Sequence, residues 1–296
     1  TLFPYTTLFR SSTTITTTLN EHINGTVSFS AMDVSLTGKI FLYDPLIKDT
    51  QGKTVITGDN VEIQVNPWQM AKLAASGDNV ASSIQAVTVV APVVHIWEKT
   101  PGEWNLASLI KKDTNAGDPG FRAVVYVRKG TIKASAIEGV SLQADSCEGM
   151  VDFSSYPELY GQITMHIDGK PIVASGYYTS MRKYDIKLHG DSVKAAYVMP
   201  FMSTTSDVKV EDGTIENISA HIVQNHRGIM ISGNGDIQNG TANVHGYKLD
   251  ALTGKVGVST DEISLKNISG NINGQAVHLD GIVKTNAETP VFQLDV

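Results

Sequence analysis

Apolar and polar residues alternate along most of the chain after residue 24. In the segment VEIQVN, 61–66, the apolar residues Val61, Ile63 and Val65 are separated by polar ones. The same alternation recurs in 161–169, 182–190, 227–233 and 254–260. Because successive side chains of a β-strand point to opposite faces, these segments predict strands with one apolar and one polar face.

Turn signals separate the alternating segments. Examples are DTQGK at 49–53, EDG at 211–213 and QNG at 238–240. They recur roughly every 8 to 12 residues, the spacing of a meandering all-β chain. Helical stretches of about a dozen residues, which a parallel sheet with crossover helices needs, are missing between the segments. The pattern therefore predicts a mostly β, antiparallel fold.

Three short segments have helical patterns. Residues 66–76 place Pro67 in a first turn, where proline is favoured. Residues 105–113 begin at Asn105, a candidate N-cap. Residues 191–202 have a weaker helical pattern that ends before a proline.

One predicted strand departs from the alternation. Residues 86–99 are apolar at both odd and even positions, so both faces of this strand need to be covered. The short helices nearby are the expected cover, and 60–112 is predicted to be a compact end. Trp68, Trp97 and Trp104 are expected in its core. From about Arg122 onward we expect bare sheet.

Composition narrows the function classes. The formal net charge of the 296 residues is −7, and no basic run occurs, which excludes nucleic acid as a partner. No apolar run approaches the roughly 18 residues of a membrane-spanning helix. Cys147 is the only cysteine, so no intrachain disulfide can form, and we expect a small buried apolar group there.

No catalytic or metal-binding motif is present. The eight histidines are scattered without H-x-x-x-H or H-E-x-x-H spacing, and those on polar parities are expected to be solvated: His166, His189 and His278. GNGDIQNG, 233–240, reads as tight turns and not as a phosphate loop. Glycosylation is not inferred from the N-x-S/T sequons at Asn24, Asn217, Asn239 and Asn267. The prediction is a protein without enzymatic activity, cofactor, catalytic residues or metal.

Residues 1–11, TLFPYTTLFRS, read like a translated sequencing adapter. We treat them as a non-native segment and expect the natural protein to begin upstream.

Three segments carry a resemblance to a known family. They are 24–68, with Tyr43, Asp44 and the 49–52 turn; IQAVTVVAPVVHIWEKTPGEWNLASLI at 84–110; and VYVRKGTIKA at 125–134, with Gly130. The residues that match in the second segment are Pro92, Gly102, Trp104, Asn105, Leu106 and Leu109. Together these segments resemble the AsmA-like/TamB family of bridge-like periplasmic lipid-transfer proteins.

The resemblance implies an elongated, twisted antiparallel sheet that forms an open U-shaped, taco-like groove, with a few short helices capping its N-terminal part. It divides the chain into the adapter-like segment 1–11, an N-terminal AsmA-like region 12–120 and a β groove 121–296 that continues beyond the fragment. The implied function is conduction of phospholipids between the inner and outer membranes, without catalysis. The implied location is the periplasm, with an inner-membrane anchor helix that this fragment lacks. The implied partners are phospholipid acyl chains and an outer-membrane β-barrel of the BamA/TamA type, the latter through a missing C-terminal region.

Residues of apolar parity are the candidates to line this groove. They are Val125, Val127, Ile163, Met165, Ile167, Tyr184, Ile186, Leu188, Ile229, Ile231, Val256 and Val258. Parity alone leaves open whether the sheet closes on itself as a sandwich or barrel. The alternative function is a secreted β-solenoid adhesin of the autotransporter type. A parallel β-helix polysaccharide enzyme would need a strip of clustered acidic and basic residues, which we do not see.

Overall fold

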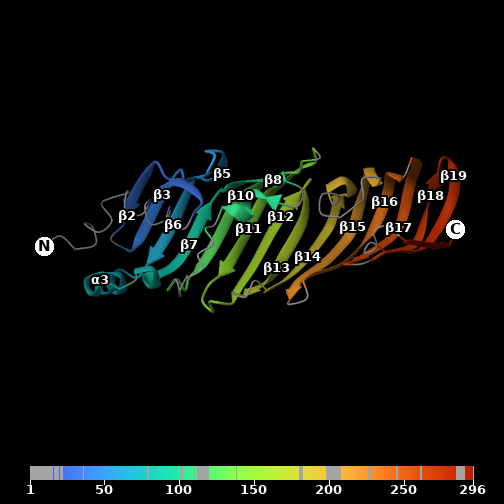
Figure 1. The fold of residues 1–296 in the computed structure, drawn as a ribbon. Helices are drawn as coiled ribbons and strands as arrows, with labels where there is room; N and C mark the ends of the chain where they lie inside the picture. Colours follow the sequence, from blue (N-terminus) through green and yellow to red (C-terminus); the bar gives the residue numbers. More distant parts are fainter. Residues whose placement is uncertain are drawn as a thin grey trace. The chain divides into compact units, whose positions relative to one another are not determined.

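Among the residues that the computed structural model describes, 72% lie in strands, which form one large open twenty-stranded sheet, and one α-helix is present (Figure 1). The mostly β class is thereby confirmed. The described residues are 16, 20, 23–35, 37–78, 80–100, 103–109, 111, 120–137, 139–179, 183–197, 208–225, 228–244, 246–260, 262–284 and 291–295. The adapter-like segment 1–11 lies outside these ranges, and so do residues 110, 112 and 113 of the predicted helix 105–113.

The chain divides into two compact units. Unit 1 comprises 1–137 with 142–163, and unit 2 comprises 138–141 with 164–296. The first twelve strands are β1 (Gly25–Ser28), β2 (Ala31–Val34), β3 (Lys39–Tyr43), β4 (Leu46–Asp49), β5 (Thr54–Thr57), β6 (Asn60–Val65), β7 (Ile84–Val90), β8 (Val93–Thr100), β9 (Glu103–Trp104), β10 (Val124–Ser135), β11 (Ser141–Asp152) and β12 (Leu159–Ile167). The others are β13 (Lys170–Thr179), β14 (Lys183–Lys194), β15 (Val208–Asn225), β16 (Gly228–Val244), β17 (Tyr247–Ser259), β18 (Glu262–Ile272), β19 (Gln275–Lys284) and β20 (Val291–Asp295).

Unit 1 is not purely antiparallel. β2, β3, β6 and β7 pair antiparallel in that order, and so do β1, β4, β5 and β8. β10, however, runs parallel to both β7 and β8, with Val125 opposite Val87 and Ile132 opposite Val94. The expectation of a wholly antiparallel sheet is therefore wrong here. A parallel pair needs a crossover connection, which alternation within strands does not reveal.

β7 and β8 are two halves of one interrupted strand. Between them Ala91 has a φ of 48°, and Lys129 in the facing strand has a φ of 55°. The interruption is bridged by backbone hydrogen bonds from Ala91 N to Arg128 O, at 2.7 Å, and from Thr131 N to Pro92 O, at 2.7 Å. Proline lacks an N–H donor and is confined to such bulges inside a sheet, which explains Pro92 within a buried strand.

The same local step recurs in neighbouring strands of unit 1. An apolar residue is followed, three positions later, by another apolar or small one, and the residue just before the second adopts a left-handed backbone. We call this an αL step. The αL steps of unit 1 are Leu42–Asp44–Pro45, Val89–Ala91–Pro92, Val127–Lys129–Gly130 and Ala144–Ser146–Cys147.

The second residues of these steps, with Gly58 between Pro45 and Pro92, form a row that we call the crease. A methyl group at Gly130 would lie 3.2 Å from Cys147 Cβ, 3.2 Å from Val127 Cγ1 and 3.3 Å from Pro92 Cγ. Cys147 is 1% exposed, as expected for a small buried apolar group. Bulges bend a strand and increase its local twist, so a row of them bends the sheet.

The helix of unit 1 covers part of its sheet. α3 (Pro67–Ser76) begins at Asn66, whose side chain accepts a hydrogen bond from Gln69 N at 3.1 Å, and ends at Gly77 with a φ of 75°. Met70 packs with Ile40, Leu42 and Val65 in a buried cluster. Residues 66–76 are thus helical as predicted.

Other expectations for the helices of unit 1 are wrong. Trp68 is 80% exposed and not in a core. Residues 105–108 form a 3-10 turn, and Asn105 does not cap it. Its buried side chain instead bonds β8, accepting from Trp97 N and donating to His95 O, both at 3.0 Å. None of the described helices is long and apolar enough to cross a membrane.

Unit 2 is an antiparallel meander. β13 to β20 pair in chain order, each with the next. The predicted helix 191–202 is wrong in its first part, because 183–194 is strand and only Ala195–Tyr197 is a 3-10 turn. Residues 198–202 lie outside the described residues.

The αL step also recurs in unit 2, once in each of four consecutive strands. The steps are Ile215–Asn217–Ile218, Ile237–Asn239–Gly240, Leu249–Ala251–Leu252 and Leu265–Asn267–Ile268. Each coincides with a one-residue shift of register between neighbouring strands. Three of the four sequon asparagines occupy αL positions, a conformation that asparagine tolerates better than most residues.

The αL positions predict an unusual response to glycine. Ala251 is exposed with a φ of 52°, so Ala251→Gly should relieve backbone strain and raise the free energy of unfolding by up to about 1 kcal/mol. Ala276→Gly, at an exposed position in β19, should lower it by roughly 0.5–1 kcal/mol. Urea unfolding followed by circular dichroism measures both. A loss of stability in both variants would contradict the αL assignment.

The crease predicts an unreactive thiol. Burial raises the pKa of the Cys147 thiol, so little of the reactive thiolate forms at pH 8. Native protein should react with Ellman's reagent far more slowly than the Ser141→Cys variant, whose new thiol lies at an exposed position of β11. Guanidinium should remove the difference. Because the folded pKa is raised, the thiol's contribution to stability is complete below the unfolded value of about 8.5 and is lost above it. A native Cys147 as reactive as the introduced thiol would disprove a closed crease.

Candidate functional site

Cross-strand register assembles one apolar face in unit 2. Residues directly opposite each other on paired strands share a face. One such row crosses six strands, from β13 to β18, and contains only aliphatic residues and glycine. It runs Ala174, Leu188, Ala220, Gly233, Val258, Ile263. We call the side of the sheet that carries this row the apolar face.

Parallel rows extend the apolar face on both sides. A second row runs Gly176, Ile186, Ile222, Ile231, and a third runs Gly235, Val256, Leu265, Gly281. Beyond the αL steps it continues with Ile237 and Gly254, then with Ala242, Leu249 and Ile272. Most of these side chains are half-buried, whereas Ile268 and Leu279 are 3% and 5% exposed.

The αL steps keep apolar side chains on this face. Strict alternation would turn Ile215 and Ile218 to opposite sides of β15. A Cβ at Gly235 would meet Ile215 Cγ2, and a Cβ at Gly233, on the same side of β16, would lie 3.4 Å from Ala220 Cβ. Ile215 and Ala220 therefore lie on one face although their parities differ. The extra residue at Asn217 makes this possible.

Six of the predicted groove residues lie on the apolar face of unit 2. They are Tyr184, Ile186, Leu188, Ile231, Val256 and Val258. Ile229 pairs with Gln224 through its backbone, and its side chain is outside the description. Met165 and Ile167 precede a turn at Asp168 and Gly169, with φ of 50° and 76°, and Ile167 is 7% exposed.

The remaining predicted residues belong to unit 1. Val125 lies opposite Val87, which lies opposite Ile63. Val127 likewise continues into a row with Val89, Val61 and Leu42. Ile163 adjoins Gly149, where an added Cβ would be 3.1 Å from Ile163 Cβ.

The cover of the apolar face differs between the units. In unit 1 helix α3 packs through Met70 on the sheet face that carries Ile40 and Leu42. In the described part of unit 2 the elements are the sheet strands and the 3-10 turn Ala195–Tyr197, with no helix or second layer to place over that face. An apolar sheet face normally packs against another element.

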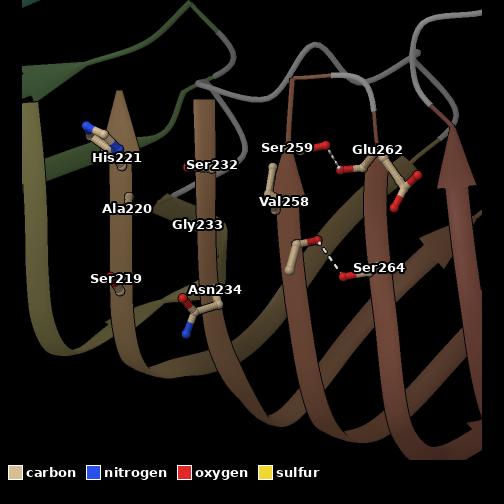
Figure 2. A pocket seen from close by; sticks show the side chains of 11 residues that line it. Ser219, Ala220, His221, Ser232, Gly233, Asn234, Val258, Ser259, Glu262 and Ser264 are labelled. Atoms are coloured by element: carbon tan, nitrogen blue, oxygen red, sulfur yellow. Dashed lines mark hydrogen bonds between the residues drawn. The ribbon is translucent and has the colours of Figure 1, made fainter. Parts of the chain in front are cut away.

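The opposite, polar face of unit 2 holds a shallow depression of about 330 Å³ (Figure 2). Its lining is Ser219, Ala220, His221, Ser232, Gly233, Asn234, Gly257, Val258, Ser259, Glu262 and Ser264. Two of its hydroxyls donate to backbone oxygens, Ser259 to Glu262 O at 3.3 Å and Ser264 to Gly257 O at 3.5 Å. Small side chains on neighbouring strands account for the hollow.

A serine, a histidine and an aspartate meet beside this depression. Ser232 lies opposite His221, and His221 Nε2 lies 2.7 Å from Asp185 Oδ1. In a catalytic triad one imidazole nitrogen bonds the carboxylate, and the other nitrogen faces the serine hydroxyl. Figure 2 shows the His221 ring directed away from Ser232. The pair is an exposed hydrogen-bonded contact, and sequence could not show it because 36 residues separate the partners.

Metal chemistry has no support in the described residues, which contain no group of three or more histidine, cysteine or acidic side chains able to hold an ion. His189 and His278 are exposed, as expected for solvated histidines. His166 differs, because it is half-buried and its Nδ1 is buried with no hydrogen-bond partner in the described structure.

Comparisons with family models, with curated proteins and with solved structures found no match to this chain.

The face assignment predicts unequal effects of the same substitution at adjacent positions. Ala220→Asp places a carboxylate between Leu188 and Gly233 on the apolar face, and it should lower the free energy of unfolding by about 2 kcal/mol. Ser219→Asp, on the polar face, should change it by about 0.5 kcal/mol or less. Urea unfolding followed by circular dichroism tests this. Equal losses at the two positions would show that the faces are wrongly assigned.

Proposed function

We propose that this chain conducts phospholipid acyl chains along the apolar face of its sheet, as a non-catalytic part of an envelope-biogenesis protein. The observation that carries the proposal is the row from Ala174 to Ile263, which offers apolar contact on six successive strands without a covering element among the described ones. Large contiguous apolar patches are rarely exposed to water in folded proteins, and where they occur they mark sites of interaction.

The energetics suit transport better than storage. Moving a sixteen-carbon tail through water exposes methylenes at about 0.8 kcal/mol each, or roughly 12 kcal/mol in total. The apolar face removes much of this cost. Along each row, successive strands lie about 4.8 Å apart, and each strand contributes an aliphatic side chain or a glycine. A chain that slides from one strand to the next therefore exchanges like contacts for like and meets no deep minimum.

The broader setting belongs to the same proposal. Movement between an inner and an outer membrane, a periplasmic location with an inner-membrane anchor and an outer-membrane barrel partner rest on the resemblance to AsmA-like/TamB proteins. The groove shape itself is also part of the proposal. The row of bulges in β15 to β18 supports it, because bulges curve a sheet.

The order of strands in unit 2 favours lipid conduction over a β-solenoid adhesin. Solenoid coils stack each strand on the equivalent strand of the next coil. β13 to β20 are instead joined as successive antiparallel neighbours. This arrangement leaves one whole face apolar, whereas a solenoid fills its interior with its own side chains.

Photo-crosslinking at adjacent positions tests the proposal. p-Benzoylphenylalanine at Ile186 or Val256 points to the apolar face, and at Lys187 or Lys255 it points to the polar face. After incubation with phosphatidylethanolamine vesicles, lipid adducts quantified by mass spectrometry should be roughly tenfold more abundant at the first two, the ratio given by about 1.4 kcal/mol.

Charge substitutions supply the matched control. Ile186→Asp should reduce adducts at Val256, while Lys187→Asp should leave them unchanged. Equal adduct yields at Ile186 and Lys187 would rule out the apolar face as the lipid path.

A further inference from the structure

One rim of unit 2 exposes large apolar side chains. At the ends of β13 to β16, Tyr177, Tyr178 and Met230 are 59%, 42% and 44% exposed. We call these strand ends the apolar rim. Its remaining apolar members are the half-buried Tyr184 and Val223.

The apolar rim is apolar on both faces of the sheet. Tyr178 lies opposite Tyr184 on the apolar face. On the polar face the row Tyr177, Asp185, Val223, Met230 carries three apolar side chains near the strand ends, and beyond it lie the pairs Thr179–Lys183 and Asn225–Gly228. One row further in, the polar face carries Lys187, His221 and Ser232 instead. The division into a polar and an apolar face therefore ends at this rim.

The opposite rim of the same strands is polar. Lys194 lies 3.1 Å from Asp168, and Lys248 lies 3.1 Å from Asp250. Lys248 N also donates to Asn273 Oδ1 at 3.1 Å. Tyr247 is exposed there, at 59%, and stands among these charged groups. Of these groups, Lys194 lies on β14, one of the strands of the apolar rim, whereas Lys248 and Asp250 lie on β17.

We propose that the apolar rim inserts into the boundary between headgroups and acyl chains of a lipid bilayer. A protein partner would cover one face of the sheet, whereas a bilayer surrounds a strand end on both faces. Tyrosine is enriched at this depth because its ring is apolar and its hydroxyl polar. Asp185 is paired with His221 at 2.7 Å, and the exposed Lys183 can reach lipid phosphates from the strand end.

This inference does not rest on the proposed function. Membrane attachment through Tyr177 and Met230 needs no lipid on the apolar face, and lipid conduction could occur without this rim. The experiment below separates the two, since the rim and the central rows are altered by different substitutions.

Flotation with vesicles of phosphatidylethanolamine and phosphatidylglycerol tests the rim. The triple variant Tyr177→Ser, Tyr178→Ser, Met230→Ser should bind at least about tenfold more weakly than the unaltered chain, because each lost side chain removes a kilocalorie or more of apolar burial. Tyr247→Ser, at the opposite rim, should bind normally. These side chains are exposed, so folding should be unaffected, which circular dichroism verifies.

Several outcomes would overturn the proposal. One is that the unaltered chain does not float with vesicles. Another is that the triple variant floats as well as the unaltered chain. A dimer that the triple variant converts to monomers, without vesicle binding, would show that the rim joins two copies of this chain. If only Ile186→Asp abolished vesicle binding, the result would contradict insertion of the apolar rim and would support lipid binding on the apolar face.

A fluorescent probe supplies an independent measurement. A nitrobenzoxadiazole label on the Met230→Cys variant should shift to the blue and brighten when vesicles are added. The same label on Asn234→Cys, two rows further in on the same face, should not respond. Buried Cys147 leaves the introduced thiol as the reactive one. Equal responses at both positions would contradict insertion of the rim.

Discussion

The register between neighbouring strands is the constraint on which the rest of this protein depends. A slip of one residue would turn every apolar side chain of a strand to the wet side. A bulge also turns the side chains that follow it in the same strand to the other face, unless the neighbouring strand carries a compensating shift of register. In unit 2 the step at Asn239 shifts the register of β16 against β17, and the step at Ala251 shifts it back. The steps are thus matched from strand to strand, and the apolar face survives the bends they introduce.

Close packing of small residues at the αL steps accompanies the bends of the sheet. Small residues follow the αL positions where the sheet is tight, as with Gly130 beside Cys147 in unit 1 and Gly240 beside Leu252 in unit 2. Tight packing there accounts for the deepest burial in the sheet, while the rows to either side are only half-buried. Under the proposed function, a surface of this kind would contact a flexible apolar ligand over many strands without holding it at one point.

The polar face contains groups that could be mistaken for chemistry. His221 and Asp185 are close, and Ser232 lies opposite His221, but the His221 ring is directed away from Ser232 (Figure 2). The hydroxyls at Ser259 and Ser264 bond backbone oxygens. Physical interest in unit 2 therefore lies with its apolar surfaces, the central rows and the rim, which are distinct and separately testable.

Alternation by itself determined that this chain forms strands with one apolar face, and it placed Ile186, Leu188 and Val256 together correctly, because parity is a local property of the backbone. Burial of the lone Cys147 also followed from the general tendency of free cysteine to be buried. Only the tertiary structure decided the αL steps, the parallel pairing of β10 and the hydrogen-bonded contact of His221. Each of these depends on which residue of one strand faces which residue of another, and that choice is made by pairing energies summed over whole strands and not by any local pattern.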